Sequence, residues 1–272
     1  MSKTKFSHLH KRNMTAPIVR RPLDILGICP VYNEEKFLPL KLKWCQVNGV
    51  PLYVMDNMSN DGTAEWIQAN LEQLAGSHTC DTGGAFDLRI LQKSLMGVIN
   101  KRKPDWVIYF GCDLFYVTEN KLAELIDYAD KKGYTAISLI VVNLYNTGEV
   151  MEKFDPLNTY YFSGTAYHRA ALIVKYSDKF NMNGDLIDIP NKKVYEAQGA
   201  AFNFGFSKSK TEREETYARR QKAWENGLPH GMGKHYRIPA SHGWLWNKDE
   251  LQDVRVGEFA KYYEILKGQV AP

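Results

Sequence analysis

The chain has 272 residues, of which 44% are hydrophobic and 24% are charged, so it is long enough for one large domain of ordinary soluble composition. No run approaches the roughly 18 apolar residues that span a bilayer. No apolar segment follows the basic N-terminus MSKTKFSHLHKRN, so we expect neither a membrane span nor a secretory signal. The net charge of +4 is mildly basic, and we expect a cytoplasmic protein.

Positive charge is concentrated before Asp24, where the chain carries no acidic residue. We expect residues 1–21 to form a basic, flexible arm. The pattern is compatible with a solvated arm and with an arm that contacts a polyanion, either nucleic acid or an anionic membrane surface. The basic residues of this arm are Lys3, Lys5, Lys11, Arg12, Arg20 and Arg21.

The cysteines show no paired metal-ligand spacing, and three of them lie inside apolar segments. We therefore expect buried free thiols rather than disulfides or a metal site. This expectation agrees with a reducing compartment. The residues concerned are Cys29, Cys45, Cys80 and Cys112.

Hydrophobic periodicity predicts alternating strands and helices along the first half of the chain. Short apolar runs such as LDILGICPVY are typical of buried parallel strands. The alternation favours an α/β fold, with a mostly parallel sheet and helices on both faces. In chain order we expect a strand over 23–32, a helix over 34–47, a strand over 51–57, a helix from Thr63 to near Gly76, a polar loop over 76–84, a helix carrying Leu88, Leu91, Leu95 and Val98, a strand over 105–113, a helix capped by Thr118 and ended by Gly133, and a strand over 135–142.

The second half of the chain is less regular, with many aromatic residues and short polar turns. One clear helix is predicted over 211–224, where acidic residues lead and basic residues trail, as the helix dipole favours. There is no internal repeat and no low-complexity tract. The sequence therefore demands no second domain, and we expect a single domain over 22–272.

Polar clusters follow three of the predicted strands. Because ligands bind beyond the carboxyl ends of the strands in open parallel sheets, these clusters predict one binding site. Acidic and amide side chains are suited to hydrogen-bonding the hydroxyls of a ribose and the edge of a base. The clusters are Tyr32-Asn33-Glu34-Glu35, Asp56-Asn57-Met58-Ser59-Asn60-Asp61-Gly62-Thr63, and Asp113 at the end of DWVIYFGCD.

A carboxylate beside a diphosphate repels it unless a cation lies between them. We therefore expect Asp113 to bind Mg²⁺ or Mn²⁺, which are hard ions that favour oxygen ligands. Such a metal neutralises the charge that grows on a departing diphosphate.

The segment ILGICPVYNEEKFL followed by GVPLYVMDNMSNDGT resembles the opening of family 2 glycosyltransferases, which have the GT-A fold. The stretch GAFDLRILQKSLMGVINKRKPDWVIYFGCDLFY resembles the part of that family where a tryptophan-bearing strand runs into an Asp-x-Asp motif. The likeness covers residues 23–120 well and the rest loosely. It implies a nucleotide-sugar-binding half over 22–145, an acceptor-side half over 146–272, and a sugar-nucleotide donor, with a UDP-sugar expected first.

The resemblance puts Tyr32, Asn33 and Glu34 beside the nucleotide, and Asp56 and Asn57 at the base or ribose. Asp113 takes the place of the last, metal-binding aspartate of the Asp-x-Asp motif. The chain departs from the pattern in two places. Gly111 stands where the first aspartate is expected, and Leu114 replaces a glutamate that often follows.

The segment GTAYHRAALIVKYSDKFNMNGDLID looks like the acceptor-side region of the family, where a Gly-Glu-Asp motif occurs. This alignment makes Asp185 the expected catalytic base, which takes the proton of the acceptor hydroxyl, with Asp188 as its alternative. The competing interpretation is that both are turn residues near Pro190.

A late histidine completes the metal site in many of these enzymes. At the matching place, AAFNFGF, this chain has Asn203, a poor metal ligand. His230 and His235 in LPHGMGKHYR are the alternative ligands, and Lys234 is a candidate contact for the diphosphate. An ordinary surface loop explains these histidines equally simply.

The leading hypothesis is a hexosyl- or pentosyltransferase that acts on a hydroxyl acceptor, either a glycan or lipid or a hydroxymethylated base in DNA. The alternative is a nucleotide-sugar-binding protein without catalysis. A dehydrogenase is disfavoured because CPVYNEE, not a Gly-x-Gly-x-x-Gly turn, follows the first strand. The DNA acceptor is suggested by the basic arm together with Lys208, Lys210, Arg219, Arg220 and Lys222.

Overall fold

The computed structural model describes residues 21–145, 159, 161–162, 168–179, 181–183, 186–188, 190–205, 207–208, 210–225 and 251–271. None of the helices in these ranges combines the length and apolar character that a membrane crossing requires. The elements, in chain order, are β1 (Ile25–Val31), α1 (Leu38–Asn48), β2 (Leu52–Asp56), α2 (Thr63–Ala69), η1 (Leu71–Gln73), β3 (Gly76–Thr79), α3 (Leu88–Arg102), β4 (Trp106–Tyr109), β5 (Leu114–Val117), α4 (Leu122–Lys131), β6 (Ala136–Tyr145), β7 (Tyr161–Phe162), β8 (His168–Lys175), β9 (Asn181–Asn183), β10 (Leu186–Asp188), β11 (Val194–Asn203), α5 (Lys210–Glu225), β12 (Gln252–Asp253) and α7 (Ala260–Val270).

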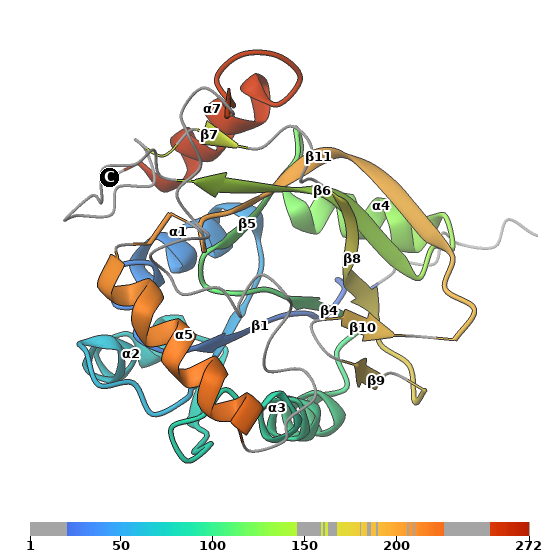
Figure 1. The fold of residues 1–272 in the computed structure, drawn as a ribbon. Helices are drawn as coiled ribbons and strands as arrows, with labels where there is room; N and C mark the ends of the chain where they lie inside the picture. The colour runs from blue at the N-terminus through green and yellow to red at the C-terminus, as the bar shows by residue number, and fades with distance from the viewer. Residues whose placement is uncertain are drawn as a thin grey trace, which may run out of the picture.

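One large mixed sheet runs through the molecule in the order β12-β7-β6-β8-β4-β1-β2-β3 (Figure 1). Strands β4, β1, β2 and β3 pair in parallel, while β8 pairs antiparallel with both β4 and β6. β11 pairs in parallel with β6 and antiparallel with β5. The predicted α/β fold class is therefore confirmed, and the carboxyl ends of β1 and β2 meet at one edge of the sheet.

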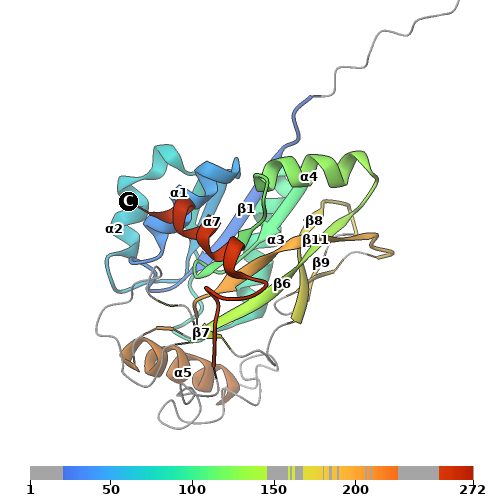
Figure 2. The same cartoon turned by 90° about the horizontal axis from the view of Figure 1, so that it is seen from above.

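Helices cover both faces of the sheet, as Figure 2 shows from above. α1, α4 and α7 contribute to the larger core on one face, and α3 packs on the other face through Leu91, Leu95 and Ile99. β1 lies between these cores, with Cys29 in the first and Ile28 in the second. Burial on both faces explains why this strand is an unbroken apolar run in the sequence.

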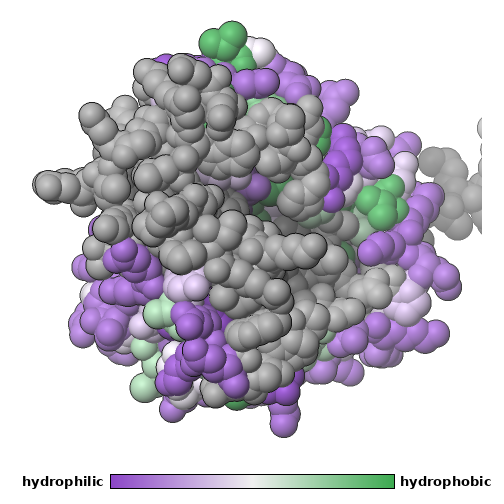
Figure 3. All heavy atoms as spheres, in the orientation of Figure 1, coloured by the Kyte–Doolittle hydropathy of each residue, from purple (hydrophilic) through white to green (hydrophobic). Residues whose placement is uncertain are grey.

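The surface of the described residues is predominantly polar. Figure 3 shows mainly hydrophilic residues on the face viewed in Figure 1, with hydrophobic ones occurring singly. All four cysteines are buried and free, as predicted. The exposed large hydrophobic side chains come from separate elements and loops, namely Val47, Met58, Leu71, Ile90, Tyr128 and Val256.

The predicted polar loop over 76–84 is wrong at its start, where Gly76–Thr79 form the edge strand β3. This strand pairs in parallel with β2. An edge strand is held by backbone hydrogen bonds and does not need apolar side chains on either face, so its polar sequence gives no strand signal. The residues of β3 are half-buried or exposed, in keeping with that position.

Two predictions around strand β4 are also wrong. The expected strand over 105–113 ends at Tyr109, and Asp113 lies in a turn in which the Leu114 amide donates to the Gly111 carbonyl at 3.2 Å. Thr118 does not cap the next helix, because its hydroxyl donates to the Asn120 carbonyl at 2.6 Å and the helix begins later, at Leu122. Asp113 therefore lies in the turn between β4 and β5 and, contrary to the prediction, does not itself end the strand.

Gly199 lies where β11 shifts register, and its φ of +153° is a conformation that side chains rarely adopt. A Cβ here would lie 2.4 Å from the Val117 carbonyl oxygen and 2.7 Å from the Leu139 side chain. Gly199→Ala is therefore expected to lower the free energy of unfolding by about 2 kcal/mol or more. Urea denaturation measures this loss. Gly97→Ala on α3 is the matched control, because a Cβ there meets nothing within 4 Å; a control that loses as much stability would contradict the steric explanation.

Candidate functional site

The first two predicted clusters lie together at the carboxyl ends of β1 and β2. The backbone N–H of Asn33 donates to the Ser59 hydroxyl at 3.0 Å. The Asn33 side chain donates to Asn60 Oδ1 at 2.7 Å and accepts from the Asn60 backbone N–H at 2.9 Å. The Glu34 backbone N–H donates to Thr63 Oγ1 at 2.8 Å. Asn33 has a φ of 54°, a left-handed conformation that asparagine tolerates better than most residues. These bonds fix the two loops against each other.

Asp113 joins the same site through a lysine that the sequence did not indicate as a donor-site residue. Lys208 Nζ lies 2.5 Å from Glu34 Oε1 and 3.5 Å from Asp113 Oδ2. The Lys208 side chain is only 14% exposed, so this ammonium group is held largely out of water. All three strand-end clusters therefore meet in one place, as the sequence predicted.

Burial dominates the electrostatics of Glu34. It raises the pKa of the Glu34 carboxyl from 4.5 to about 7, against the attraction of Lys208 and with further help from Asp113. Burial alone would lower the pKa of Lys208, but the attraction of Glu34 and then of Asp113 overcomes it and raises that pKa. The site thus holds a firmly protonated lysine beside a carboxyl that titrates near neutrality.

The raised pKa of Glu34 predicts a pH dependence of stability. A carboxyl with a pKa of 4.5 when unfolded and about 7 when folded binds more protons in the folded state between these values. Its contribution to the free energy of unfolding is complete below the lower pKa. As the pH rises through the folded pKa, up to about 3 kcal/mol is lost. Glu34→Gln is expected to abolish this loss, so the variant gains stability over wild type as the pH rises from about 5 to about 8.

Urea denaturation of both proteins across this pH range tests the prediction. Glu65→Gln on α2 provides the control, because Glu65 is exposed and its replacement should leave the pH profile of wild type intact. If wild type and Glu34→Gln lost stability in parallel as the pH rises, burial would not be what raises the pKa of Glu34.

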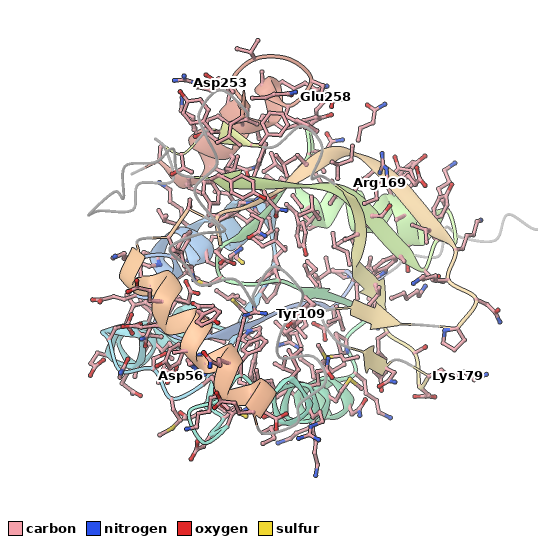
Figure 4. All side chains as sticks on the ribbon, in the orientation of Figure 1. Asp56, Tyr109, Arg169, Lys179, Asp253 and Glu258 are labelled. Carbon is pink, nitrogen blue, oxygen red and sulfur yellow. The ribbon has the colours of Figure 1, made fainter. Side chains whose placement is uncertain are left out.

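The residues at the end of β2 are buried and already hydrogen-bonded. Asp56, labelled in Figure 4 beside α5, is 6% exposed and accepts from the backbone and the hydroxyl of Ser59 at 3.1 and 2.5 Å. Asn57 is 4% exposed, and with its side-chain amide turned so that both of its atoms are satisfied, the amide accepts from Arg219 Nη2 at 2.6 Å and donates to the Cys80 carbonyl at 2.9 Å. The pair is therefore ordered by the protein itself.

Helix α5 lies across these loops, at the end of the molecule opposite α4 (Figures 1 and 2). The Arg219 guanidinium lies 3.3 Å from the centroid of the Tyr32 ring. The side-chain Nδ2 of Asn33 donates to Glu215 Oε2 at 3.4 Å, and Lys36 pairs with Glu212 at 3.0 Å. The candidate site is thus covered by α5, the helix whose basic residues suggested a nucleic-acid acceptor.

Four of the basic residues that suggested a nucleic-acid acceptor contact the protein itself, while the side chain of Lys210 and the arm before residue 21 lie outside what the structure describes. Lys208 pairs with carboxylates, Arg219 lies on Tyr32, and Arg220 lies 4.6 Å from the centroid of the Phe86 ring. Lys222 donates to the Gly83 carbonyl at 2.8 Å. Their positive charge is therefore directed at the strand-end loops.

Two buried polar atoms at the site have no hydrogen-bond partner among the described residues. They are Glu34 Oε2 and Arg219 Nε. A buried polar atom without a partner costs about 1–3 kcal/mol, so native proteins rarely retain one without a reason. A polar ligand that reaches these atoms would provide such a reason.

Within the described residues, no group of three or more His, Cys, Asp or Glu side chains could hold a metal. The Lys208 ammonium lies between the Glu34 and Asp113 carboxylates, 2.5 Å from Glu34 Oε1 and 3.5 Å from Asp113 Oδ2. The Asn203 amide donates to Asn143 at 2.8 Å and accepts from the Gly205 N–H at 3.0 Å. The Mg²⁺ or Mn²⁺ expected at Asp113 stays a prediction.

Other predicted site residues stay untested. Asp185, Lys234, His230 and His235 lie outside the described residues. Asp188 ends β10, in register with Asn181 of β9 in a two-stranded hairpin. The assignment of Asp185 or Asp188 as the catalytic base therefore remains a prediction.

No protein-family model and no curated protein matches the chain. Among solved structures it is similar to S. aureus TarS, with 13% identity and a TM-score of 0.39 over 84% of this chain and 44% of that one. It is also similar to TarS 1–349, with 14% identity and a TM-score of 0.38 over 79% and 68% of the two chains. The structure of TarS 1–349 in complex with UDP has 13% identity to this chain and a TM-score of 0.38, over 81% of this chain and 74% of that one. The chain thus spans less than half of the longest of these, and similarity at this level identifies no chemistry.

Proposed function

We propose that this chain is a GT-A-type glycosyltransferase that moves a sugar from a nucleoside-diphosphate donor to a hydroxyl acceptor. The observation that carries the proposal is the convergence of the three strand-end clusters: the first two are hydrogen-bonded to each other, and Lys208 contacts both Glu34 of the first and Asp113 of the third. Buried carboxylates, amides and cations at the carboxyl ends of parallel strands suit a ligand with a base, a ribose and a diphosphate.

Each group has a role in this proposal. Asp56 and Asn57 bind the base or ribose, and Tyr32 and Asn33 lie beside the nucleotide. The Tyr32 ring already accepts a planar group on its face, since the Arg219 guanidinium lies 3.3 Å from its centroid. In this proposal Asp113 lies nearest the diphosphate. The positive charge beside it is the ammonium of Lys208, which Glu34 and Asp113 hold in place.

The reaction forms one bond and breaks another at the anomeric carbon. The acceptor hydroxyl oxygen bonds to this carbon, and the bond from the carbon to the phosphate oxygen breaks. The nucleoside diphosphate leaves with the electron pair of that bond. The acceptor proton goes to a carboxylate, for which Asp185 is the first candidate and Asp188 the second.

Nucleotide binding and turnover test the proposal directly. We expect UDP to raise the melting temperature of the protein, because a ligand that binds only the folded state stabilises it. Donor hydrolysis or transfer is then measured with a panel of UDP-hexoses and UDP-pentoses, with and without Mn²⁺. A protein that shows neither a thermal shift nor turnover with any nucleoside diphosphate donor would contradict the proposed function.

The second candidate is a nucleotide-sugar-binding protein without catalysis. It is favoured by Gly111 in place of the first aspartate of the motif and by α5, whose Arg219 covers Tyr32 and bonds Asn57. Tight nucleotide binding with no turnover, unchanged in Asp185→Asn, would support this function over the enzyme.

The acceptor is proposed only as a hydroxyl compound, either a glycan or lipid or a hydroxymethylated base in DNA. Duplex binding that weakens steeply with added salt would support the DNA acceptor, because phosphate contacts release counterions. Binding that is absent or insensitive to salt would remove it.

A further inference from the structure

Lys208 lies between two carboxylates that come from distant parts of the fold. Glu34 follows β1, Asp113 precedes β5, and Lys208 lies in the segment between β11 and α5. The ammonium approaches them at 2.5 and 3.5 Å, and the Glu34 and Asp113 side chains are only 11% and 20% exposed. Isolated carboxylates at such a site would repel a diphosphate, so a positive charge is needed there.

We propose that the ammonium of Lys208 binds the donor diphosphate in place of a divalent cation, so that nucleotide binding needs no metal. The inference rests on the proposed donor site and deepens it by naming the group that supplies the counter-charge. An ammonium donates up to three hydrogen bonds and serves as a compact point charge for phosphate.

The donor set favours the lysine over a metal. Mg²⁺ demands a near-octahedral shell of oxygen ligands at 2.0–2.1 Å, and like charge excludes it from the space next to an ammonium group. Gly111 and Leu114 remove two carboxylates that the resembling family offers near Asp113. Asn203 has its amide engaged by Asn143 and Gly205. The residues that surround Asp113 therefore suit an ammonium group better than a divalent cation.

The groups around Lys208 are suited to its release toward a ligand. The pKa of Glu34 is about 7, so this carboxyl can take up a proton when the ammonium turns toward a phosphate oxygen. Glu34 Oε2 and Arg219 Nε are buried without hydrogen-bond partners in the described part of the chain. The Arg219 guanidinium is a second cation, held against the ring of Tyr32 in the first strand-end cluster. These features fit an anionic ligand with several polar atoms.

Calorimetric titration of the full chain with UDP, in EDTA and in Mn²⁺, tests the proposal. We expect wild type to bind with Kd values that agree within about twofold in the two conditions. Lys208→Gln is expected to raise the Kd in EDTA at least about tenfold, because the loss of one charge-assisted hydrogen bond has an effect of this order. Lys208→Arg keeps the charge and should retain most of the affinity. The control is Lys131→Gln on α4, which removes an equal charge from an exposed pair with Asp127 and should bind as wild type does.

The outcomes separate this inference from the proposed function. Wild type that binds UDP only with Mn²⁺, or Lys208→Gln that binds as tightly as wild type in EDTA, would overturn the role of Lys208 and leave the donor site standing. Wild type that binds no nucleoside diphosphate in either condition would overturn both. Thermal unfolding checks that each variant is folded. If Lys208→Gln does not fold, wild type in EDTA against Mn²⁺ and the Lys208→Arg variant decide the question.

Discussion

Asp113→Asn is expected to lower the rate of sugar transfer at least about a hundredfold, the loss typical of removing one preorganised charge from an active site. The variant keeps the shape of the side chain but loses the negative charge, which lies 3.5 Å from Lys208 Nζ. In the proposed site, that charge holds the Lys208 ammonium in position for the diphosphate. Initial rates with a UDP-sugar that wild type accepts measure the effect.

The size of this effect depends on the position of Asp113 rather than on the loss of any carboxylate. Asp127→Asn on α4 removes an equal charge from an exposed pair and is expected to transfer sugar at the wild-type rate. Equal thermal unfolding of wild type and Asp113→Asn would show that the fold is intact. An Asp113→Asn protein with undiminished activity would remove Asp113 from the site.

The sequence predicted the strands that position the site because their burial leaves a pattern. β1 alternates between two cores, with Cys29 facing one and Ile28 the other, so both faces require apolar residues. The polar residues directly after such a run stand out by contrast. The clusters of Asn33 and Asp56, and their position at one edge of the sheet, are therefore predictable from the sequence.

The sequence did not predict features that depend on distant partners. Lys208 lies 174 residues after Glu34, and nothing in its local pattern indicates that it pairs with that carboxylate. Arg219 is equally hidden, because a basic residue on a polar helix is ordinarily a surface residue. Neither β3 nor the start of α4 is predictable, for a similar reason. β3 is held by backbone pairing with β2, which leaves no periodic signal in the sequence. The hydrogen bond from Thr118 to the Asn120 carbonyl leaves none either.

Trp44→Ala is expected to lower the free energy of unfolding by about 3–5 kcal/mol, the range for deleting a large buried aromatic side chain. Trp44 on α1 is fully buried, with its ring centroid 5.8 Å from that of Phe110 and 6.2 Å from that of Phe115, both edge-to-face. These two residues flank the turn that carries Asp113. The cavity would therefore weaken the core directly beneath the candidate site, and urea denaturation measures the loss.

Two further variants separate packing from other contributions of the indole. Trp66→Ala on α2 deletes the same side chain where it is only half-buried, so its loss should be clearly smaller. Trp44→Phe keeps an aromatic ring and removes an indole Nε1 that is buried without a hydrogen-bond partner among the described residues. Because no hydrogen bond is lost, Trp44→Phe should lower the free energy of unfolding much less than Trp44→Ala does. Equal losses for phenylalanine and alanine would mean that the ring contacts with Phe110 and Phe115 do not hold this core together.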